Sequence, residues 1–442
     1  MTKKCLIIAA GKGSRLQPEG EIKPLVPLLG IPLIERVIRS AAKAGIDDFY
    51  VVIGYQGEWV RAFLDGLAGS LGVRIIAIIN EDWDKENGLS VLKARGHLQE
   101  PFLLLMADHL FDPAIVRELT QTPLAEGEII LAMDKHIGNP LVDMEDVTRV
   151  KLKNGKIQHI GKGLTDFDGF DTGIFLCAPA IFEALERCAE EHDDTTLSGA
   201  VRVLAAQDRA KVVDISGYFW IDVDDPAALK RAEEALLARL RHKPNDGPVS
   251  RYLNRPLSVR ISRWLVNHPI TPNQISLFSF LSSMVAAVLF TLGDYLTLSL
   301  GGILAQLASI IDGCDGEVAR LKFQSSPYGG WLDAVLDRYA DACLLFAFTW
   351  HAYANTADSL VLFAGFMAVL GSFMTSYTAD KYDSLMRERI RQGRGFRLGR
   401  DVRLFLIFLG AIFNQVYLTL VVVAVIMNIE TIRRVIICRN YA

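Results

Sequence analysis

Residues 312–320 read DGCDGEVAR and follow directly on the apolar run YLTLSLGGILAQLASII at residues 295–311. A segment apolar enough for a membrane therefore ends in three acidic side chains, Asp312, Asp315 and Glu317. Ionisable side chains at the edge of hydrocarbon are costly, and those that occur there mark functional sites by default. This stretch therefore predicts a membrane helix that ends in a site.

The next apolar segment begins with Asp333 and Asp337. Since spacings of three and four residues each place two side chains on one helical face, we expect the pair Asp312 and Asp315 to meet this second pair. Four converging carboxylates repel one another, and Mg²⁺ or Mn²⁺ would relieve that repulsion through oxygen ligands. The alternative is that the acids pair with Arg320, Lys322 and Arg338 at a hydrated helix end.

A metal in this position favours a phosphate ligand. Small residues leave room for such a ligand near the backbone, at Gly313, Gly316, Ala319, Gly329 and Gly330. Arg320 and Lys322 supply counter-charge for a diphosphate, with Lys322 as a substrate-binding candidate.

The same stretch resembles the CDP-alcohol phosphotransferase family, whose motif D-x2-D-G-x2-A-R-x8-G-x3-D-x3-D is met at every fixed position. The resemblance covers about 250–440 and includes ITPNQIS at 270–276. It implies that an alcohol hydroxyl attacks the β-phosphorus of a CDP-alcohol and that CMP leaves. The four aspartates would hold two metals, Asp337 would be the general base, and Gly316, Ala319 and Arg320 would bind the nucleotide.

Charge and hydropathy divide the chain of 442 residues. Residues 1–245 carry a net charge of −8 and residues 246–442 a net charge of +4. We predict a cytoplasmic domain over 1–243, a linker over 244–250 and a membrane domain over 251–442. The opening MTKKCLIIAAGKG does not resemble a signal peptide, so the first domain should stay in the cytoplasm.

The predicted membrane domain is all-α, with six spans and an N-terminal amphipathic helix over 251–268. In that helix Leu253, Leu257, Ile261, Trp264 and Leu265 share one face, and Arg251, Arg255, Arg260 and Arg263 lie elsewhere. This pattern favours a helix on the membrane surface, and a docking helix between domains is the alternative. Splitting the block 404–429 at Asn414–Gln415 keeps the basic loops and both termini on the cytoplasmic side of a multi-pass membrane protein.

In the first domain, short apolar runs such as CLIIAA and PFLLLMAD alternate with amphipathic stretches, which predicts an α/β doubly wound, mostly parallel sheet. The first run leads into the Gly-rich turn at Ala10, Gly11 and Gly13, and Arg15 follows. Such a turn brings backbone amides to a triphosphate.

The wider pattern LIIAAGKGSRLQP with KPLVPLLG resembles the sugar-nucleotide pyrophosphorylase type of nucleotidyltransferase. The resemblance implies that Arg15 and Lys23 neutralise the triphosphate and that Asp108 and Asp222 hold Mg²⁺, with Asp224 and Asp225 as alternatives for the second ligand. It also places Asn87, Gly88 and Ser90 at the base, and Lys162 and Asp171 at the alcohol phosphate. Surface-loop roles remain the alternative for these last residues.

The presence of both domains in one chain predicts that the first makes a CDP-alcohol from CTP and that the second consumes it. As a whole, the chain resembles bifunctional enzymes that join an inositol-1-phosphate cytidylyltransferase to a di-inositol-phosphate phosphate synthase. This resemblance implies inositol phosphate as substrate and a phosphorylated di-inositol phosphate as product. Arg389 and Arg391, in an arginine-rich segment that also holds Arg394, Arg397 and Arg400, would bind the acceptor phosphate or form a positive cytoplasmic loop.

Two other functions stay open at this point. A lipid could replace the soluble acceptor, or the chain could be a membrane-anchored regulatory module that binds CTP without turnover. The bilayer is an expected partner and nucleic acid is not. Polar residues in the span 331–353 suit either a cavity wall or the interface of a homodimer.

Overall fold

The computed structural model describes residues 3–241, 246–385 and 399–439. The chain divides into two compact units, Met1–Glu234 and Ala235–Ala442. The division falls within helix α7, which runs over Pro226–Arg241. Of the predicted linker 244–250, residues 244 and 245 lie outside the described residues.

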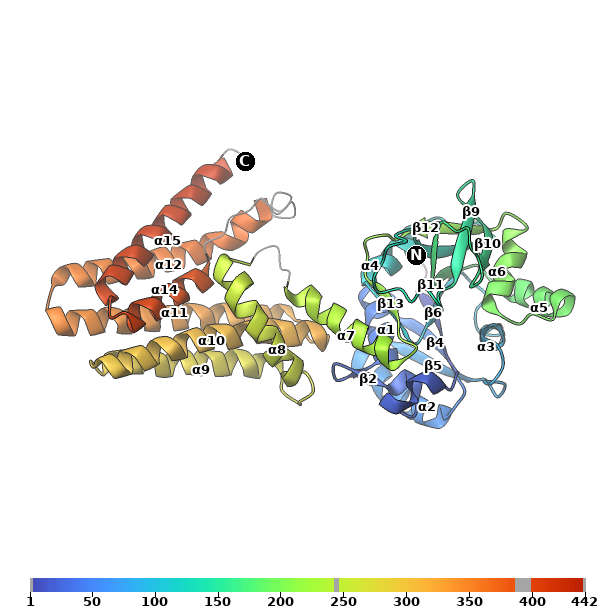
Figure 1. Ribbon diagram of the computed structural model, residues 1–442, viewed down its shortest axis with the longest axis horizontal. Helices are drawn as coiled ribbons and strands as arrows, with labels where there is room; N and C mark the ends of the chain where they lie inside the picture. The colour runs from blue at the N-terminus through green and yellow to red at the C-terminus, as the bar shows by residue number, and fades with distance from the viewer. Residues whose placement is uncertain (1–2, 242–245, 386–398, 440–442) are drawn as a thin grey trace. The chain divides into compact units, whose positions relative to one another are not determined.

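A nine-stranded sheet forms the centre of the first unit, with the strand order β5-β4-β1-β6-β11-β8-β12-β10-β9 (Figure 1). One half is parallel and contains β1 (Lys4–Ala9), β4 (Asp48–Ile53), β5 (Arg74–Ile79) and β6 (Phe102–Met106). Its connections contain η1 (Ser14–Glu19), η2 (Lys23–Leu25), the hairpin β2 (Pro27–Leu28) and β3 (Ile31–Pro32), and the helices α1 (Leu33–Lys43), α2 (Gly57–Leu71) and α3 (Asn87–Leu92). This half agrees with the predicted doubly wound pattern.

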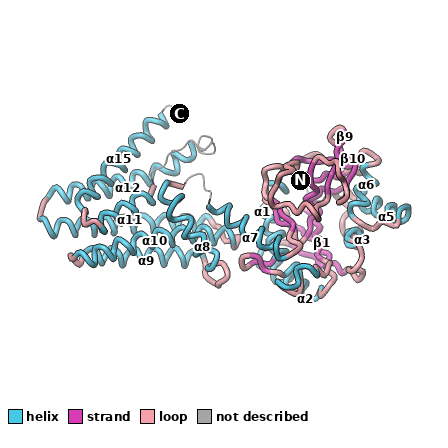
Figure 2. The backbone as a smooth tube through the Cα atoms, viewed as in Figure 1, coloured by secondary structure: helices cyan, strands magenta, loops and turns pink. Residues whose placement is uncertain are grey.

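The other half is largely antiparallel, so the prediction of a mostly parallel sheet was only partly right. It contains β8 (Ile129–Asp134), β9 (Arg149–Lys153), β10 (Lys156–Gly161), β11 (Gly169–Cys177) and β12 (Ala210–Asp214). Strand β11 runs antiparallel to both β6 and β8. The reason is that β8 to β11 are joined by loops and a hairpin rather than by helices, as Figure 2 shows, and only a helix-length crossover allows parallel pairing.

Beyond β11, the helices α5 (Ala180–His192) and α6 (Leu197–Ala205) lead to β12, which pairs parallel with β8. The helix α4 (Pro113–Gln121) follows β7. A short antiparallel pair, β7 (His109–Phe111) with β13 (Trp220–Asp222), places Asp222 opposite His109. This pairing brings residues more than a hundred positions apart to one edge of the site.

The second unit is entirely helical within the described residues. It begins with the π-helical turn η3 (Ser250–Asn254), and continues through α8 (Arg255–Leu265), α9 (Pro272–Thr291), α10 (Tyr295–Leu321), α11 (Pro327–Thr356), α12 (Ser359–Leu385), α14 (Arg400–Ile412) and α15 (Val416–Arg439). The break between α14 and α15 falls at the predicted position, Asn414–Gln415. By length and apolar composition, three of the described segments suit a membrane span: Pro272–Thr291, Tyr295–Leu321 and Ser359–Ala379.

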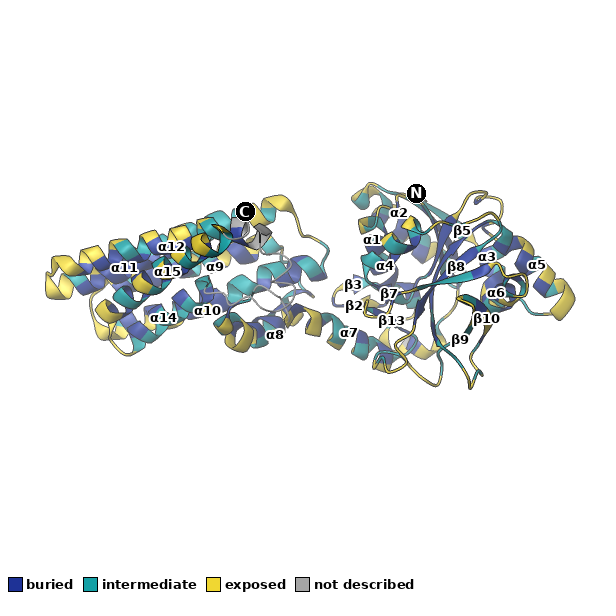
Figure 3. Cartoon of the chain, turned by 90° about the horizontal axis from the view of Figure 1, so that it is seen from above, coloured by how far each residue is buried: buried dark blue, intermediate teal, exposed yellow. Residues whose placement is uncertain are grey.

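Helix α8 packs on α10 through a buried polar face, and Ile261 and Leu265 add apolar contacts near Cys314 and Val318. Arg255, Ser258 and Ser262 are buried, whereas Leu257 and Trp264 are 37% and 60% exposed. The prediction grouped Arg255 with arginines at the lipid surface, and this was wrong, because its guanidinium is bound by Asp246 and by Glu317 of α10. Exposed residues also follow the outer faces of the longer helices in Figure 3.

Candidate active sites

The first site is a pocket of about 350 Å³ beside the carboxyl ends of β1 and β6. The turn after β1 lines it with Ala10, Gly11 and Gly13. The structure brings the other predicted residues to the same pocket, namely Arg15, Lys23, Asn87, Asp108, Lys162, Asp171 and Asp222. The pairing of parallel strands explains this, because their carboxyl ends meet at one edge.

Lys23 lies at the centre of the pocket's charges. Its Nζ is 2.5 Å from Asp108 Oδ2 and also contacts Asp224. Burial lowers the pKa of Lys23, but the carboxylates of Asp108, Asp224 and Asp222 outweigh it, so the pKa lies above its ordinary value. Gly13 makes this position possible, since it has φ +62° and a Cβ on it would lie 2.4 Å from Lys23 Cβ.

A second group in the pocket contains the oxygens of Asp108 and Asp222 and the imidazole of His109. His109 Nε2 lies 3.3 Å from Asp222 Oδ1 and 3.7 Å from Asp108 Oδ1. Asp224 and Asp225 line the same pocket, where Asp224 shares Lys23 with Asp108 and also binds Arg15, and Asp225 accepts from the Ala228 N–H at the start of α7. Of the three aspartates left open for the second metal ligand, Asp222 is the one grouped with both Asp108 and His109.

The alcohol-phosphate candidates, Lys162 and Asp171, line the same pocket. Lys162 and Arg15 both contact Asp146, with Arg15 Nη1 at 2.8 Å from Asp146 Oδ2. Asp171 Oδ1 accepts a hydrogen bond of 2.8 Å from the Gly173 N–H. Burial raises the pKa of Asp171 to about 6, against the effect of that backbone hydrogen bond.

The two base-recognition candidates differ in position. Asn87 lines the pocket, and its Oδ1 accepts a hydrogen bond of 2.9 Å from the Leu197 N–H. Ser90 is 4% exposed, and its hydroxyl accepts a hydrogen bond of 2.9 Å from Asn80 Nδ2 instead of lining the pocket. Gly88 has no room for a side chain, since a Cβ would lie 2.3 Å from the Thr195 carbonyl oxygen.

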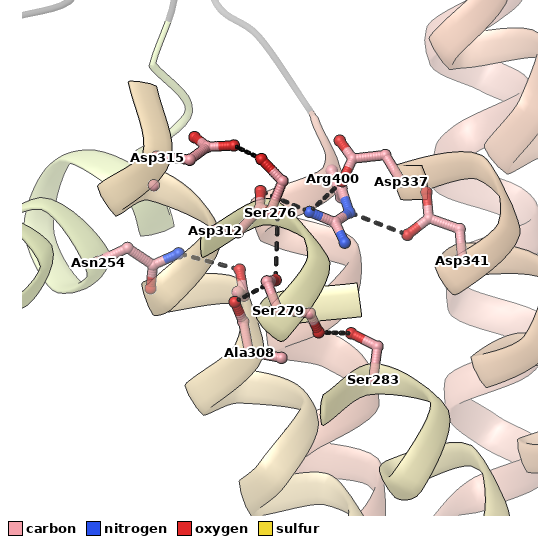
Figure 4. A network of polar contacts seen from close by, with 12 residues as sticks. Asn254, Ser276, Ser279, Ser283, Ala308, Asp312, Asp315, Asp337, Asp341 and Arg400 are labelled. Atoms are coloured by element: carbon pink, nitrogen blue, oxygen red, sulfur yellow. Dashed lines mark hydrogen bonds and ion pairs between the residues drawn. The ribbon is translucent and has the colours of Figure 1, made fainter. Parts of the chain in front are cut away.

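The second site lies where α10 and α11 face α14. Carboxylate oxygens of Asp312, Asp333 and Asp337 lie within 4.8 Å of one another. Asp315 stands beside this group, and its Oδ2 accepts a hydrogen bond of 2.5 Å from Ser276 Oγ. Figure 4 shows Ser276 and Asp315 on one side of the cluster and Asp337 on the other.

Arg400 of α14 enters the middle of the aspartates. Its Nη1 lies 2.7 Å from Asp312 Oδ2 and 2.8 Å from Asp337 Oδ1 (Figure 4). Its Nε is 3.1 Å from Asp341 Oδ1, and Arg403 pairs with the other oxygen of Asp341. Sequence reasoning had placed Arg400 only in the arginine-rich segment, whose candidates Arg389 and Arg391, with Arg394 and Arg397, lie outside the described residues.

The remaining motif residues have distinct surroundings. Arg320 Nη2 is buried without a hydrogen-bond partner among the described residues. Lys322 donates to the carbonyl oxygens of His268 and Ile270, at 2.5 and 3.0 Å, and so ties the loop between α8 and α9 to α10. The Gly316 N–H donates to Asp315, and Ala319 is buried. The ammonium group of Lys322, which the sequence suggested for substrate binding, is therefore directed at backbone carbonyl oxygens.

Several site residues were missed by sequence reasoning. His109 directly follows Asp108, so its proximity could have been inferred from the sequence MADH. Ser279 also escaped, although it lies one helical turn after Ser276 and donates at 3.2 Å to Asp312 Oδ1 and at 3.0 Å to the Ala308 carbonyl oxygen. Asp146 carried no spacing signal, because its partners are remote in the chain, whereas Asp341 continues the four-residue spacing of Asp333 and Asp337 and could have been found from it.

Both groups of acids suit a divalent cation. Asp222 Oδ1 is buried and accepts no hydrogen bond from a described residue, which leaves its lone pairs for a ligand. At the second site, three carboxylates face one guanidinium, so negative charge remains to be neutralised. Oxygen donors in such sets fit Mg²⁺ or Mn²⁺.

Comparison with known proteins agrees with this division into two sites. Residues 5–209 match the MobA-like NTP transferase domain, and residues 269–432 match the CDP-alcohol phosphatidyltransferase family. A protein of Rubrobacter xylanophilus, described as "Bifunctional IPC transferase and DIPP synthase", is 37% identical over 433 residues, which cover 97% of this chain and 94% of that protein. The chain belongs to this bifunctional family.

A second member of the bifunctional family, from Aquifex aeolicus, is 34% identical over 440 residues, covering 98% of this chain and 97% of that protein. Among solved structures, the inositol-1-phosphate CTP transferase from T. maritima is 25% identical, with a TM-score of 0.48, over 53% of this chain and 94% of that one. The chain is thus a transferase with two catalytic regions. Asp108 lies in the first matched region and the cluster of Asp312, Asp333 and Asp337 in the second.

Proposed function

We propose that the chain catalyses two consecutive reactions. In the first, inositol 1-phosphate and CTP give CDP-inositol and pyrophosphate. In the second, the inositol-phosphate group passes from CDP-inositol to a second inositol 1-phosphate, CMP leaves, and a phosphorylated di-inositol phosphate forms. The observation that carries this proposal is the presence of two separate acidic clusters in a chain of the bifunctional family. One cluster contacts the largely buried side chain of Lys23 and the other that of Arg400.

In the first reaction, a phosphate oxygen of inositol 1-phosphate attacks the α-phosphorus of CTP in line. Lys23 and Arg15 line the pocket on the side of the Gly-rich turn, where they offset the charge that develops on the pyrophosphate. Lys162 approaches from β10, where it would bind the incoming alcohol phosphate. Asp108 and Asp222 would hold Mg²⁺ or Mn²⁺, which supplies further charge neutralisation at the phosphates.

The ion pairs seen in this pocket explain how its cations stay in place. Asp146 contacts both Lys162 and Arg15, and Asp224 contacts both Arg15 and Lys23. The two aspartates thereby hold the three cationic side chains in one cluster. A substrate phosphate that enters would exchange these carboxylate contacts for its own.

In the second reaction, the acceptor hydroxyl attacks the β-phosphorus of CDP-inositol. Asp337 is the proposed general base, and its Oδ1 lies 2.8 Å from Arg400 Nη1. The buried, unpartnered Nη2 of Arg320 is the proposed donor to the diphosphate. Asp312, Asp315, Asp333 and Asp337 would hold the divalent cations that neutralise this diphosphate.

We further propose six membrane spans, formed by α9, α10, α11, α12, α14 and α15. Large apolar side chains face outward along them, for example Phe278 (58% exposed), Phe346 (66%), Phe366 (64%) and Ile429 (59%). Exposed apolar surface on this scale suits lipid contact. We also propose a multi-pass position in the cell membrane, with the nucleotidyltransferase unit and both termini on the cytoplasmic side, because basic residues favour that side.

Helix α14 has only 13 residues, fewer than the roughly 20 of a typical membrane span. It contacts α10 at both ends: Arg400 Nη1 reaches Asp312 at 2.7 Å, and the Tyr295 hydroxyl donates to the Ile412 carbonyl oxygen at 2.9 Å. Residues 295–312 of α10 rise about 26 Å at 1.5 Å per residue. The 13 residues of α14 rise only about 20 Å, against roughly 30 Å of hydrocarbon in a bilayer, so we propose α14 as a short span that the side chains of Arg400 and Tyr295 join to α10 at its two ends.

The amphipathic helix α8 would lie at the cytoplasmic surface of this bilayer. Its polar face is occupied by α10, while Tyr252, Leu257 and Trp264 are exposed. Arg251, Arg260 and Arg263 are exposed as well, so their guanidinium groups could contact lipid phosphates.

Phosphorus NMR of the detergent-purified chain tests the proposed reactions directly. The sample receives CTP, Mg²⁺ and inositol 1-phosphate, with glycerol 3-phosphate in a parallel sample and no added lipid. We expect pyrophosphate, CMP and a new phosphodiester resonance from inositol 1-phosphate. If the spectrum stops at pyrophosphate and a CDP-alcohol, the soluble acceptor is wrong and a lipid acceptor takes its place.

A further inference from the structure

The imidazole of His109 has no role in the two reactions described so far, yet it faces the metal-binding carboxylates. Its Nε2 lies 3.3 Å from Asp222 Oδ1 and 3.7 Å from Asp108 Oδ1. Adjacent ligands of a six-coordinate Mg²⁺ or Mn²⁺ are separated by about 3 Å, since each lies about 2.1 Å from the ion. The imidazole nitrogen therefore lies within about 1 Å of that spacing from both carboxylate oxygens, and the ligand atoms of the three residues all lie within 4.8 Å of one another.

The ring of His109 is held in one orientation from behind. Its Nδ1 lies 2.6 Å from the Thr172 carbonyl oxygen, which can only accept, so Nδ1 carries a proton. In a neutral ring, Nε2 then has its lone pair directed at the two carboxylates. Metal-ligating histidines are typically fixed in this way by a carbonyl or carboxylate on the second nitrogen.

The backbone beside the ring is shaped for this position. Gly173 has φ +70°, and a Cβ on it would lie 2.4 Å from His109 Nδ1. Any larger residue at 173 would therefore displace the imidazole or strain the backbone. The β7–β13 pairing places Asp222 opposite His109 from the other side.

The carboxylates complete the arrangement. Asp108 uses Oδ2 for Lys23, which leaves Oδ1 facing His109. Asp222 Oδ1 is buried and accepts no hydrogen bond from a described residue. One oxygen from each carboxylate is thus directed at the same space as the imidazole nitrogen.

We propose that His109 Nε2 is a third protein ligand of the metal ion at the nucleotidyltransferase site, together with Asp108 and Asp222. The proposal rests on the proposed function of this pocket and adds a consequence for the metal. Imidazole is a better ligand for Mn²⁺ and later transition metals than for Mg²⁺. The first reaction should therefore reach half of its maximal rate at a lower Mn²⁺ than Mg²⁺ concentration.

Pulsed electron paramagnetic resonance of bound Mn²⁺ tests the ligand without depending on activity. The full chain, free of any histidine tag, is prepared with ¹⁵N only in histidine and loaded with Mn²⁺. We expect nuclear modulation from a directly bound ¹⁵N. The described residues of the second site offer oxygen ligands and arginine nitrogens but no histidine, so the label distinguishes the two sites.

Two variants assign the signal. His109→Asn should remove the ¹⁵N modulation and weaken Mn²⁺ binding at this site about tenfold or more, since even partners of metal ligands contribute that much. His159→Asn, which changes an exposed histidine on β10, is the matched control and should leave both unchanged. Absence of histidine ¹⁵N modulation in the unaltered chain overturns the proposal, and so does its persistence in His109→Asn.

Pyrophosphate release from CTP is measured on the same samples. Turnover without the ¹⁵N modulation refutes the histidine ligand and leaves the proposed function standing. Modulation without pyrophosphate release on addition of inositol 1-phosphate supports the ligand and refutes the proposed reaction.

Discussion

Glu317 should control the attachment of α8 to the catalytic helix α10. Its side chain is fully buried, and Oε1 accepts from Arg255 Nη1 at 2.6 Å and from Ser258 Oγ at 2.7 Å. Oε2 accepts from Ser262 Oγ at 2.7 Å. One carboxylate therefore binds three donors of α8, spaced over two helical turns.

The size of the effect follows from these contacts. Glu317→Ala removes one buried ion pair and leaves two buried hydroxyls without their acceptor. Loss of one partner of a buried ion pair costs about 3–5 kcal/mol. Arg255 keeps Asp246, through contacts of 2.8 and 3.1 Å, so its charge is not left alone and the lower part of that range applies. About 3–4 kcal/mol corresponds to a shift of roughly 10²- to 10³-fold in the docking equilibrium of α8.

Hydrogen exchange with mass spectrometry in detergent measures this shift. We expect amides of Arg255–Leu265 to exchange about 10²- to 10³-fold faster in Glu317→Ala, while those of α12 and α15 stay as protected as before. Arg260→Ala, which removes an exposed charge from the same helix, is the matched control and should change little. Unchanged protection of α8 would refute the reasoning, and equal acceleration in α12 and α15 would show that Glu317 stabilises the whole unit instead.

Three further changes have specific expected results. Gly13→Ala should lower kcat/KM of the first reaction about 100-fold in a pyrophosphate-release assay, because its Cβ would collide with Lys23 and misplace the ammonium group. The control Gly66→Ala, which has open space around its Cβ, should leave kcat/KM unchanged. Gly365→Ala should lower the stability of the detergent-solubilised chain by about 1–3 kcal/mol, seen as a reduced Tm, because a Cβ there would lie 2.2 Å from Thr349 Oγ1 of α11. Removal of divalent cations with EDTA should stop the release of both pyrophosphate and CMP, and Mn²⁺ or Mg²⁺ should restore both; release of either product in EDTA would argue against a metal at that site.

The parts of the fold that could be predicted were those set by local pattern. The apolar runs CLIIAA and PFLLLMAD correspond to β1 and β6, and the block 404–429 divides into α14 and α15 at Asn414–Gln415 as predicted. The antiparallel direction of β11 was missed, because nothing in GFDTGIFLC distinguishes a strand that follows a hairpin from one that follows a helix. The direction in which a strand pairs depends on the segment that leads into it. The segment that leads into β11 is a loop, and the sequence does not specify the path of that loop.

The sites show the same limit. Asp312, Asp333 and Asp337 could be grouped because their spacing places them on helical faces. Arg400 could be identified as basic but not as the partner of Asp312, 88 residues away, since that contact depends on how α14 packs on α10. The buried polar face of α8 was also misjudged, because its apolar face was assumed to be the one that packs against protein or lipid, and Glu317 was not matched with Arg255 and the two serines.

The two catalytic sites should act independently of each other. The variants Asp108→Ala and Asp337→Ala test this independence most directly. Both variants are given CTP, inositol 1-phosphate and Mg²⁺, and separately synthetic CDP-inositol with inositol 1-phosphate. We predict that Asp108→Ala releases no pyrophosphate yet still forms CMP from CDP-inositol, whereas Asp337→Ala releases pyrophosphate and accumulates CDP-inositol. A single variant that loses both reactions would contradict the two-site account.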